Sequence, residues 1–102
     1  MKAEELIVKT LEVSTCMIPR VTDDFLAGRD TNDLDRLHLY YALTEYGYRF
    51  PVPVPPTALA KLRLTGHGAL TTLIQRAESL GCHYLQLDSD ADVIDGLPQF
   101  EW

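Results

Sequence analysis

The fold is decided by the stretch Gly81-Cys-His-Tyr-Leu-Gln-Leu-Asp-Ser-Asp-Ala-Asp-Val-Ile-Asp-Gly-Leu-Pro-Gln-Phe-Glu-Trp102. It contains an apolar alternation over residues 83–87, a polar turn, a second short apolar run and a closing aromatic pair. It carries five acidic residues and no Lys or Arg: Asp88, Asp90, Asp92, Asp95 and Glu101. Disordered acidic tails lack such apolar runs, so this stretch predicts an ordered strand–turn–strand with an acidic rim.

The composition is that of one globular domain. A chain of 102 residues has the size of a single domain with one hydrophobic core, and we assign residues 1–102 to it. Hydrophobic residues make up 46% and charged residues 24%, which excludes a fibrous or disordered protein.

The negative net charge of the chain disfavours some classes of binding partner and favours others. A net charge of −6 argues against direct binding of nucleic acid or of anionic lipid, both of which attract Lys and Arg. It favours a basic protein partner. The first apolar run, Leu6 to Val8, is short and ends at Lys9, so we expect no signal peptide, no membrane span and a cytoplasmic location. In that compartment Cys16 and Cys82 are expected as free thiols.

Two elements are predicted before residue 30. Residues Leu6 to Ser14 alternate imperfectly and indicate a strand that is buried on at least one face. A short helix is expected over Arg20 to Ala27, followed by a polar loop from Arg29 to Asp35. Val21, Phe25 and Leu26 would form the apolar face of that helix.

The central segment predicts a β-hairpin from Leu37 to Val54, with its turn at Thr44-Glu45-Tyr46-Gly47. Period-two spacing places Leu37, Leu39, Tyr41 and Leu43 on one face of the first strand, and Tyr46, Tyr48, Phe50, Val52 and Val54 on one face of the second. Arg49 falls on the opposite face, where we expect it in solvent. Proline at positions 51, 53 and 55 removes alternate backbone donors, so the second strand must either lie at a sheet edge or leave the sheet early.

Two helices and a strand complete the prediction. A short helix capped by Thr57 would run through Leu64, and a longer one would end at Gly81. Gly66-His67-Gly68 is either the turn between them or an exposed histidine available for function. After the strand at residues 83–87, Asp88 to Ala91 forms a turn and Val93-Ile94 begins a final strand. The expected fold is therefore α+β: a mainly antiparallel sheet of four to five strands with two to three helices on one face.

The aspartates invite a metal-site hypothesis. The spacing Asp88-x-Asp90-x-Asp92 is typical of hard-cation ligands, but a calcium loop starting at Asp88 needs Gly and Glu where this chain has Val93 and Gln99. Cysteine and histidine residues lack the close spacing of zinc ligands. No phosphate-cradling loop and no nucleophile elbow occur, so we expect no cofactor and no catalytic residue.

The tyrosines of the hairpin leave two alternatives open. Five aromatic residues lie within eleven positions: Tyr40, Tyr41, Tyr46, Tyr48 and Phe50. They either fill the core or leave rings exposed as a patch suited to protein contact.

Several motifs resemble a family of small acidic bacterial proteins of unknown function, which are encoded on chromosomes, plasmids and integrative elements. The motifs are Ser14-Thr15-x-x-Ile18-Pro19, Glu45-Tyr46-Gly47-Tyr48, Leu80-Gly81-Cys82-His83-Tyr84-Leu85, and Val93-Ile94-Asp95-Gly96-Leu97-Pro98-x-Phe100-x-Trp102. Relatives often carry His before Ile18, where this chain has Met17. The resemblance implies a role on mobile elements, through binding of another macromolecule such as a host-defence component.

The leading hypothesis is thus a non-enzymatic interaction protein. Its binding residues would be Asp88, Asp90, Asp92 and Asp95, with Tyr46 and Tyr48 adding apolar contact to a basic protein surface. The alternatives are a small metal-dependent enzyme that uses Asp88, Asp90 and Asp92, and a homodimer formed through the hairpin edge.

Overall fold

The computed structural model describes residues 8–28 and 41–100. The predicted loop at 29–35, the first half of the predicted hairpin strand, the start of the first strand and Trp102 lie outside these residues. Among those described, no helix has the length and apolar character needed to cross a bilayer.

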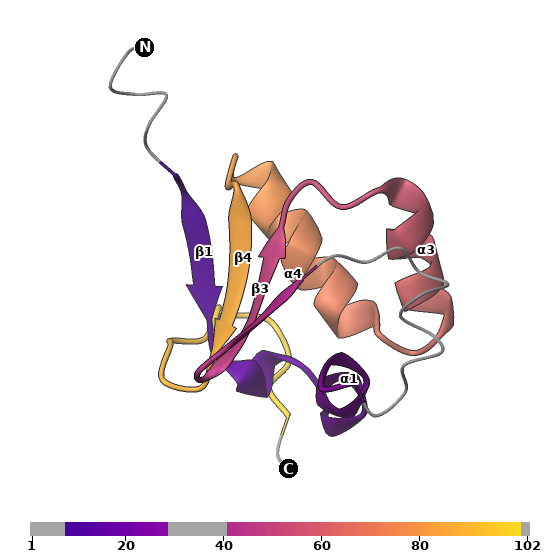
Figure 1. Cartoon of the computed structure of the whole chain (residues 1–102), viewed down its shortest axis with the longest axis horizontal. Coiled ribbons are helices and arrows are strands. Elements are labelled where there is room, and N and C mark those ends of the chain that lie inside the picture. The colour runs from indigo at the N-terminus through magenta and orange to yellow at the C-terminus, as the bar shows by residue number, and fades with distance from the viewer. Residues whose placement is uncertain (1–7, 29–40, 101–102) are drawn as a thin grey trace.

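A four-stranded sheet forms the centre of the fold, in the order β1-β4-β3-β2 (Figure 1). The strands are β1 (Thr10–Val13), β2 (Ala42–Thr44), β3 (Gly47–Pro51) and β4 (Tyr84–Asp88). β2 and β3 form an antiparallel hairpin, β3 pairs antiparallel with β4, and β1 pairs parallel with β4. The hairpin turn lies where the sequence predicted it, with Thr44 opposite Gly47.

One face of the sheet is buried beneath the helices. Alternate residues of three strands point into the core: Val13, Tyr48, Phe50, Leu85 and Leu87. Helix α4 (Gly68–Ser79) packs on β4 with Leu70, Leu73, Ile74 and Ala77, and α3 (Pro56–Leu64) packs against α4 (Figure 1). The α+β class, the mainly antiparallel sheet and the placement of helices on one face are confirmed.

The opposite face of the sheet is more polar. Glu12 is exposed, and Tyr84, Gln86 and Arg49 are half-buried. Arg49 was expected in solvent, and this was wrong: its guanidinium lies 4.1 Å from the centre of the Tyr84 ring. A cation over an aromatic face is attracted by the ring quadrupole, which favours this stacking over full hydration.

The second strand of the hairpin leaves the sheet early. β3 lies between β4 and β2, so it is an interior strand, and it ends at Pro51. The last backbone hydrogen bond in this direction runs from the Val52 N–H to the His83 carbonyl (3.0 Å). Of the two alternatives that the prolines left open, early departure is therefore correct and the edge position is wrong.

Helix α1 (Arg20–Leu26) buries two of the three residues predicted for its apolar face, Phe25 and Leu26, but not Val21. Val21 is 60% exposed, whereas Thr22 is fully buried together with Phe25 and Leu26. The spacing of three and four residues is that of a helix face, but its first member is polar. Thr22 can be buried because a hydrogen bond of 2.9 Å joins its hydroxyl to Nδ1 of His67.

His67 is a core residue and not an exposed one. It occupies the turn between α3 and α4, as the Gly66-His67-Gly68 pattern allowed, but only 5% of it is exposed. Its ring stacks on Phe25 with 4.5 Å between ring centres. The Thr22–His67–Phe25 contact therefore attaches α1 to the α3–α4 turn.

Thr22→Val is expected to lower the free energy of unfolding by about 1–3 kcal/mol, because it keeps the shape of residue 22 but removes its hydrogen bond to buried His67. Urea denaturation followed by circular dichroism measures the change. The matched control is Thr72→Val, which removes an exposed hydroxyl that donates to Gly68 within α4. Equal stabilities of the two variants would contradict the structural role of the Thr22–His67 contact.

The two later helices end where predicted, but α3 begins for a different reason. α3 begins at Pro56 after Pro55, with no side-chain cap, so the expected Thr57 cap is wrong. Proline suits a first helical position because its missing N–H would have no partner there. α4 ends at Ser79, close to the predicted stop, and Gly81 adopts a positive φ of 73° as expected of a glycine after a helix.

The predicted final strand at Val93-Ile94 is absent. Residues 91–100 contain turns and irregular structure but no strand. The physical reason is that β4 is already paired on both sides, by β1 and by β3. A strand after the turn has no free edge of β4 to pair with. Val93, Ile94 and Leu97 instead pack against the core as partly buried side chains.

Candidate functional site

The acidic loop, defined here as residues Asp88 to Asp95, follows the central strand of the sheet. An aspartate turn starts it: the Asp88 side chain accepts a hydrogen bond from the Asp90 N–H (2.9 Å), and its carbonyl accepts one from the Ala91 N–H (3.1 Å). Aspartate favours such turns because its short side chain replaces a backbone acceptor. Asp90, Asp92 and Asp95 are exposed and Asp88 is half-buried.

Hydrogen bonds to the N-terminal part of the chain hold the loop on its far side. The Ser14 N–H donates to the Asp92 carbonyl at 2.8 Å, and the Phe100 N–H donates to the Cys16 carbonyl at 2.7 Å. Ser14 is in turn the N-cap of the 3-10 helix η2 (Thr15–Met17), because its hydroxyl accepts from the Cys16 N–H. The acidic loop is thus bonded to the N-terminal segment at Asp92, and the chain that follows the loop is bonded to η2 at Phe100.

The same contacts bring together two stretches that carried the family resemblance. Leu97, Pro98 and Phe100 line a cavity of about 310 Å³ with Met17 and three residues of α4. The segment around Ile18 and the C-terminal signature are therefore neighbours in space. Sequence separation alone gave no indication of this contact.

The hairpin tip, defined as Glu45 and Tyr46, lies beside the acidic loop. The Ser89 N–H donates to the Tyr46 carbonyl at 3.1 Å, and Gly47 is the register partner of Asp88. Tyr46 is 52% exposed. The structure therefore places the predicted binding residue Tyr46 next to the predicted aspartates.

Tyr48 does not form an exposed patch with Tyr46. Only 6% of it is exposed, and its hydroxyl donates to Oδ1 of Asp23 at 2.8 Å. Phe50 is fully buried, and Tyr41 is half-buried with its hydroxyl bonded to the Leu26 carbonyl at 2.6 Å. Burial raises the pKa of Tyr41. Of the two alternatives for these rings, the core position holds for Tyr48 and Phe50, and Tyr46 alone of the described hairpin tyrosines is exposed.

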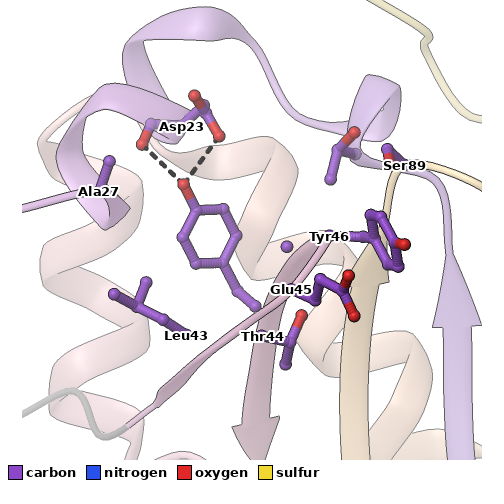
Figure 2. Close-up of a pocket in the computed structure, with 10 residues that line it drawn as sticks. Asp23, Ala27, Leu43, Thr44, Glu45, Tyr46 and Ser89 are labelled. Atoms are coloured by element: carbon purple, nitrogen blue, oxygen red, sulfur yellow. Dashed lines mark hydrogen bonds between the residues drawn. The ribbon is translucent and has the colours of Figure 1, made fainter.

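A cavity of about 500 Å³ lies between the hairpin tip and α1 (Figure 2). In Figure 2, Ala27 and Leu43 lie on one side of it, Glu45 and Tyr46 on the other, and Asp23 at one end. Its wall is formed by Thr15, Asp23, Ala27, Leu43, Thr44, Glu45, Tyr46, Gly47, Tyr48 and Ser89. Among the residues that the structure describes, this wall includes two carboxylates and no Lys, Arg or His.

Asp23 and Glu45 are the members of this site that the sequence did not identify. Asp23 lies on α1, nineteen positions before the first residue of β2 (Ala42), and the pattern around it indicates only a short amphipathic helix. Glu45 is a turn residue, for which an exposed charge is ordinary. Only the packing of α1 over the end of the hairpin brings them to one cavity.

The metal hypothesis gains no support from this geometry. In the part of the chain that the structure describes, no three His, Cys, Asp or Glu side chains gather closely enough to hold a metal ion. The first aspartate of the proposed set is bonded to the backbone of its own turn. Cys82 is buried and His83 is exposed, and both cysteines are free thiols, as predicted for Cys16 and Cys82.

Comparison with known proteins gives a family but no activity. Residues 10–102 match the model described as "Family of unknown function (DUF5983) C-terminal domain". A search of curated proteins and a search of solved structures return no match to this chain. The matched span covers the whole sheet, every described helix and the acidic loop.

Proposed function

The chain belongs to the DUF5983 family of unknown function, because residues 10–102 match the model of that family's C-terminal domain. We propose that the chain is a non-enzymatic binding domain that presents its acidic loop to a basic protein. The observation that carries the proposal is the fixation of the loop. The bond from the Ser14 N–H to the Asp92 carbonyl holds the loop on one side, and the bond from the Ser89 N–H to the Tyr46 carbonyl holds it against the hairpin tip.

The fixed conformation of the acidic loop affects both the entropy cost of binding and the electrostatic potential of its aspartates. A mobile acidic segment loses much backbone conformational entropy when it binds, whereas a preformed one loses much less. Charges at fixed positions also create a localised negative potential, which speeds the encounter with a basic surface and selects its orientation. The loop carries four aspartates and no basic residue.

The hairpin tip extends this surface with an apolar element. Tyr46 is 52% and Leu43 is 68% exposed, and both belong to the hairpin that contacts the loop. Tyrosine supplies a large contact area with few rotatable bonds and is enriched at protein interfaces. The proposed surface therefore combines charge for orientation with an aromatic side chain for affinity.

The resemblance to small proteins of bacterial mobile elements suggests the kind of partner. We propose an accessory role for this acidic protein in which the basic partner is a host-defence component that itself binds nucleic acid. Such a partner has a cationic surface that an acidic loop can occupy. We place this binding in the cytoplasm, where buried Cys82 and partly exposed Cys16 stay reduced.

The test is affinity capture from the organism that encodes the chain, followed by measurement with the purified partner. Asp90→Asn together with Asp92→Asn is expected to weaken binding at least about tenfold, since each charge-assisted contact contributes about 1 kcal/mol or more. Wild-type affinity is expected to fall as NaCl rises, because salt screens exposed charges.

The matched control changes net charge equally at a distant place. Thr57→Lys with Ala60→Lys adds two positive charges on exposed positions of α3, away from the acidic loop in Figure 1. This control is expected to bind like wild type. If both double variants lose the same affinity for the partner, the loop acts only through the net charge of the protein. If neither variant loses affinity, the acidic loop is not the binding surface.

A further inference from the structure

We infer that the cavity between the hairpin tip and α1 is the receptor site for one arginine side chain of the partner protein. This inference rests on the proposed function and identifies the central contact of that surface. The juxtaposition that carries it is a pair of carboxylates, Asp23 and Glu45, with two tyrosines on the wall of one cavity of about 500 Å³.

The cavity has the size and lining of a binding site. Its volume lies within the range of roughly 300–1,000 Å³ that is usual for ligand sites. Ala27, Leu43, Tyr46 and Tyr48 provide apolar and aromatic wall, against which the aliphatic part of a long side chain can pack. Tyr48 is fixed in place by its hydrogen bond to Asp23, so this part of the wall is already formed.

The charges of the wall select a cation. Asp23 accepts a bond from the Tyr48 hydroxyl at Oδ1, and a carboxylate has further lone pairs for other donors. Glu45 is exposed on the opposite side of the cavity. Ser89, between two aspartates of the acidic loop, also lines the cavity, so the loop adds its negative potential at the entrance.

Arginine fits this wall better than lysine. A planar guanidinium donates several N–H groups in fixed directions and stacks on aromatic rings, whereas an ammonium is a compact and strongly hydrated charge. The chain already contains such a stack on its own sheet, where Arg49 lies over Tyr84.

An additional polar group of the wall is unsatisfied. Oγ1 of Thr44 is buried and has no hydrogen-bond partner among the residues that the structure describes. A buried hydroxyl without a partner is unfavourable, and an incoming N–H donor relieves this deficit. Because a hydroxyl both donates and accepts, this group adds a hydrogen-bonding position to the wall, and the choice of a cationic donor as the ligand rests on the two carboxylates.

The test is a titration of the ¹⁵N-labelled chain with Nα-acetyl-arginine N-methylamide at low ionic strength, followed by amide chemical shifts. Saturable shifts are expected at Ala27, Glu45, Tyr46 and Gly47, with a dissociation constant on the order of millimolar for this single side chain. The norleucine analogue, which has an apolar stem and no charge, is expected to cause no saturable shift. The lysine analogue is expected to bind at least about threefold more weakly.

Glu45→Gln is expected to raise the dissociation constant of the arginine probe at least about fivefold. Glu12→Gln, which removes an exposed carboxylate on β1 that does not line the cavity, is the matched control and is expected to change nothing. Shifts that do not saturate, equal binding of norleucine or lysine analogues, or no effect of Glu45→Gln would overturn the assignment.

The two proposals fail separately. If the probe does not bind but the Asp90/Asp92 variant still loses the captured partner, the arginine site is wrong and the binding role stands. If the probe binds the cavity but partner binding is insensitive to the acidic loop, the site stands and the proposed function is wrong.

Discussion

Gly47→Ala is expected to lower the free energy of unfolding by about 2–4 kcal/mol and the melting temperature by roughly 10–25 °C. A Cβ at position 47 would lie 1.8 Å from the carbonyl oxygen and 2.7 Å from the carbonyl carbon of Leu87. Both atoms belong to the backbone of the central strand, so no side-chain rotation can remove the clash. β3 and β4 must separate at this end of the sheet.

The consequences of Gly47→Ala extend to the proposed binding surface. Gly47 follows the hairpin tip directly, and it is paired with Asp88 at the start of the acidic loop. Separation of these strands breaks the bond from the Ser89 N–H to the Tyr46 carbonyl. We therefore expect large amide shift changes at residues 45–47 and 88–91 in the variant.

Gly68→Ala is the control for this prediction. Gly68 is the first residue of α4, and a Cβ there meets no atom within 4 Å. Alanine also restricts the unfolded chain, so this variant is expected to be neutral or more stable by up to about 1 kcal/mol. Thermal and urea denaturation of the two variants side by side measure the difference. A Gly47→Ala protein as stable as wild type would show that β3 and β4 are not packed as described.

Phe50→Ala is expected to cost about 3–5 kcal/mol, because Phe50 is the largest fully buried side chain among residues 8–28 and 41–100 and lies in the centre of the sheet. Phe50 lies opposite Leu85 in register, and its ring centre is 5.3 Å from that of Tyr41. A domain of this size has a total stability of about 5–15 kcal/mol, so the variant retains little margin.

Two control variants distinguish the effect of the empty space left in the core by Phe50→Ala from the effect of losing an aromatic ring. Phe50→Leu keeps an apolar side chain at the site and is expected to cost about half as much. Tyr46→Ala removes a ring from the same hairpin, but this ring is half exposed, so its cost is expected to stay within about 0.5 kcal/mol. A Phe50→Ala protein that unfolds at the same urea concentration as Tyr46→Ala would contradict the described core.

The elements that could be predicted from the sequence are those with a local signal. Leu70, Leu73, Ile74, Ala77 and Leu80 recur at helical spacing. The structure buries the first four in α4, whereas Leu80, the residue that caps the end of the helix, is 47% exposed. Leu85 and Leu87 alternate and are fully buried on β4. The Thr44–Gly47 turn and the aspartate turn after β4 depend on side chains within four residues, so both were found correctly.

The elements that were missed depend on contacts between distant segments. Val93-Ile94 has the composition of a strand, but pairing is a property of the neighbouring strands, and β1 and β3 already flank β4. Thr22 is buried because His67, forty-five positions later, supplies its hydrogen-bond partner. Hydrophobicity patterns cannot identify a polar residue that is buried through such a partner.

In the candidate site, too, the features with a local sequence signal were predicted and those that depend on contacts between distant segments were not. The aspartates of the loop were visible as a charge cluster, and their exposure agrees with the expectation for Asp90, Asp92 and Asp95. The burial of Tyr48 followed from α1, whose position over the hairpin no local pattern encodes. The cavity itself combines residues of η2, α1, the hairpin and the acidic loop, and no single stretch of sequence contains it.

Amide hydrogen exchange combined with ¹⁵N relaxation of the acidic loop tests the central claim most directly. Within the loop, the amides of Ser89 and Ala91 donate to backbone carbonyls, so we predict slowed exchange and order parameters of about 0.85 at these positions, equal to those of β4. Exchange at the rate of an unstructured peptide, with order parameters below about 0.6, would show that the aspartates are not held in place, and the proposed binding surface would then not exist.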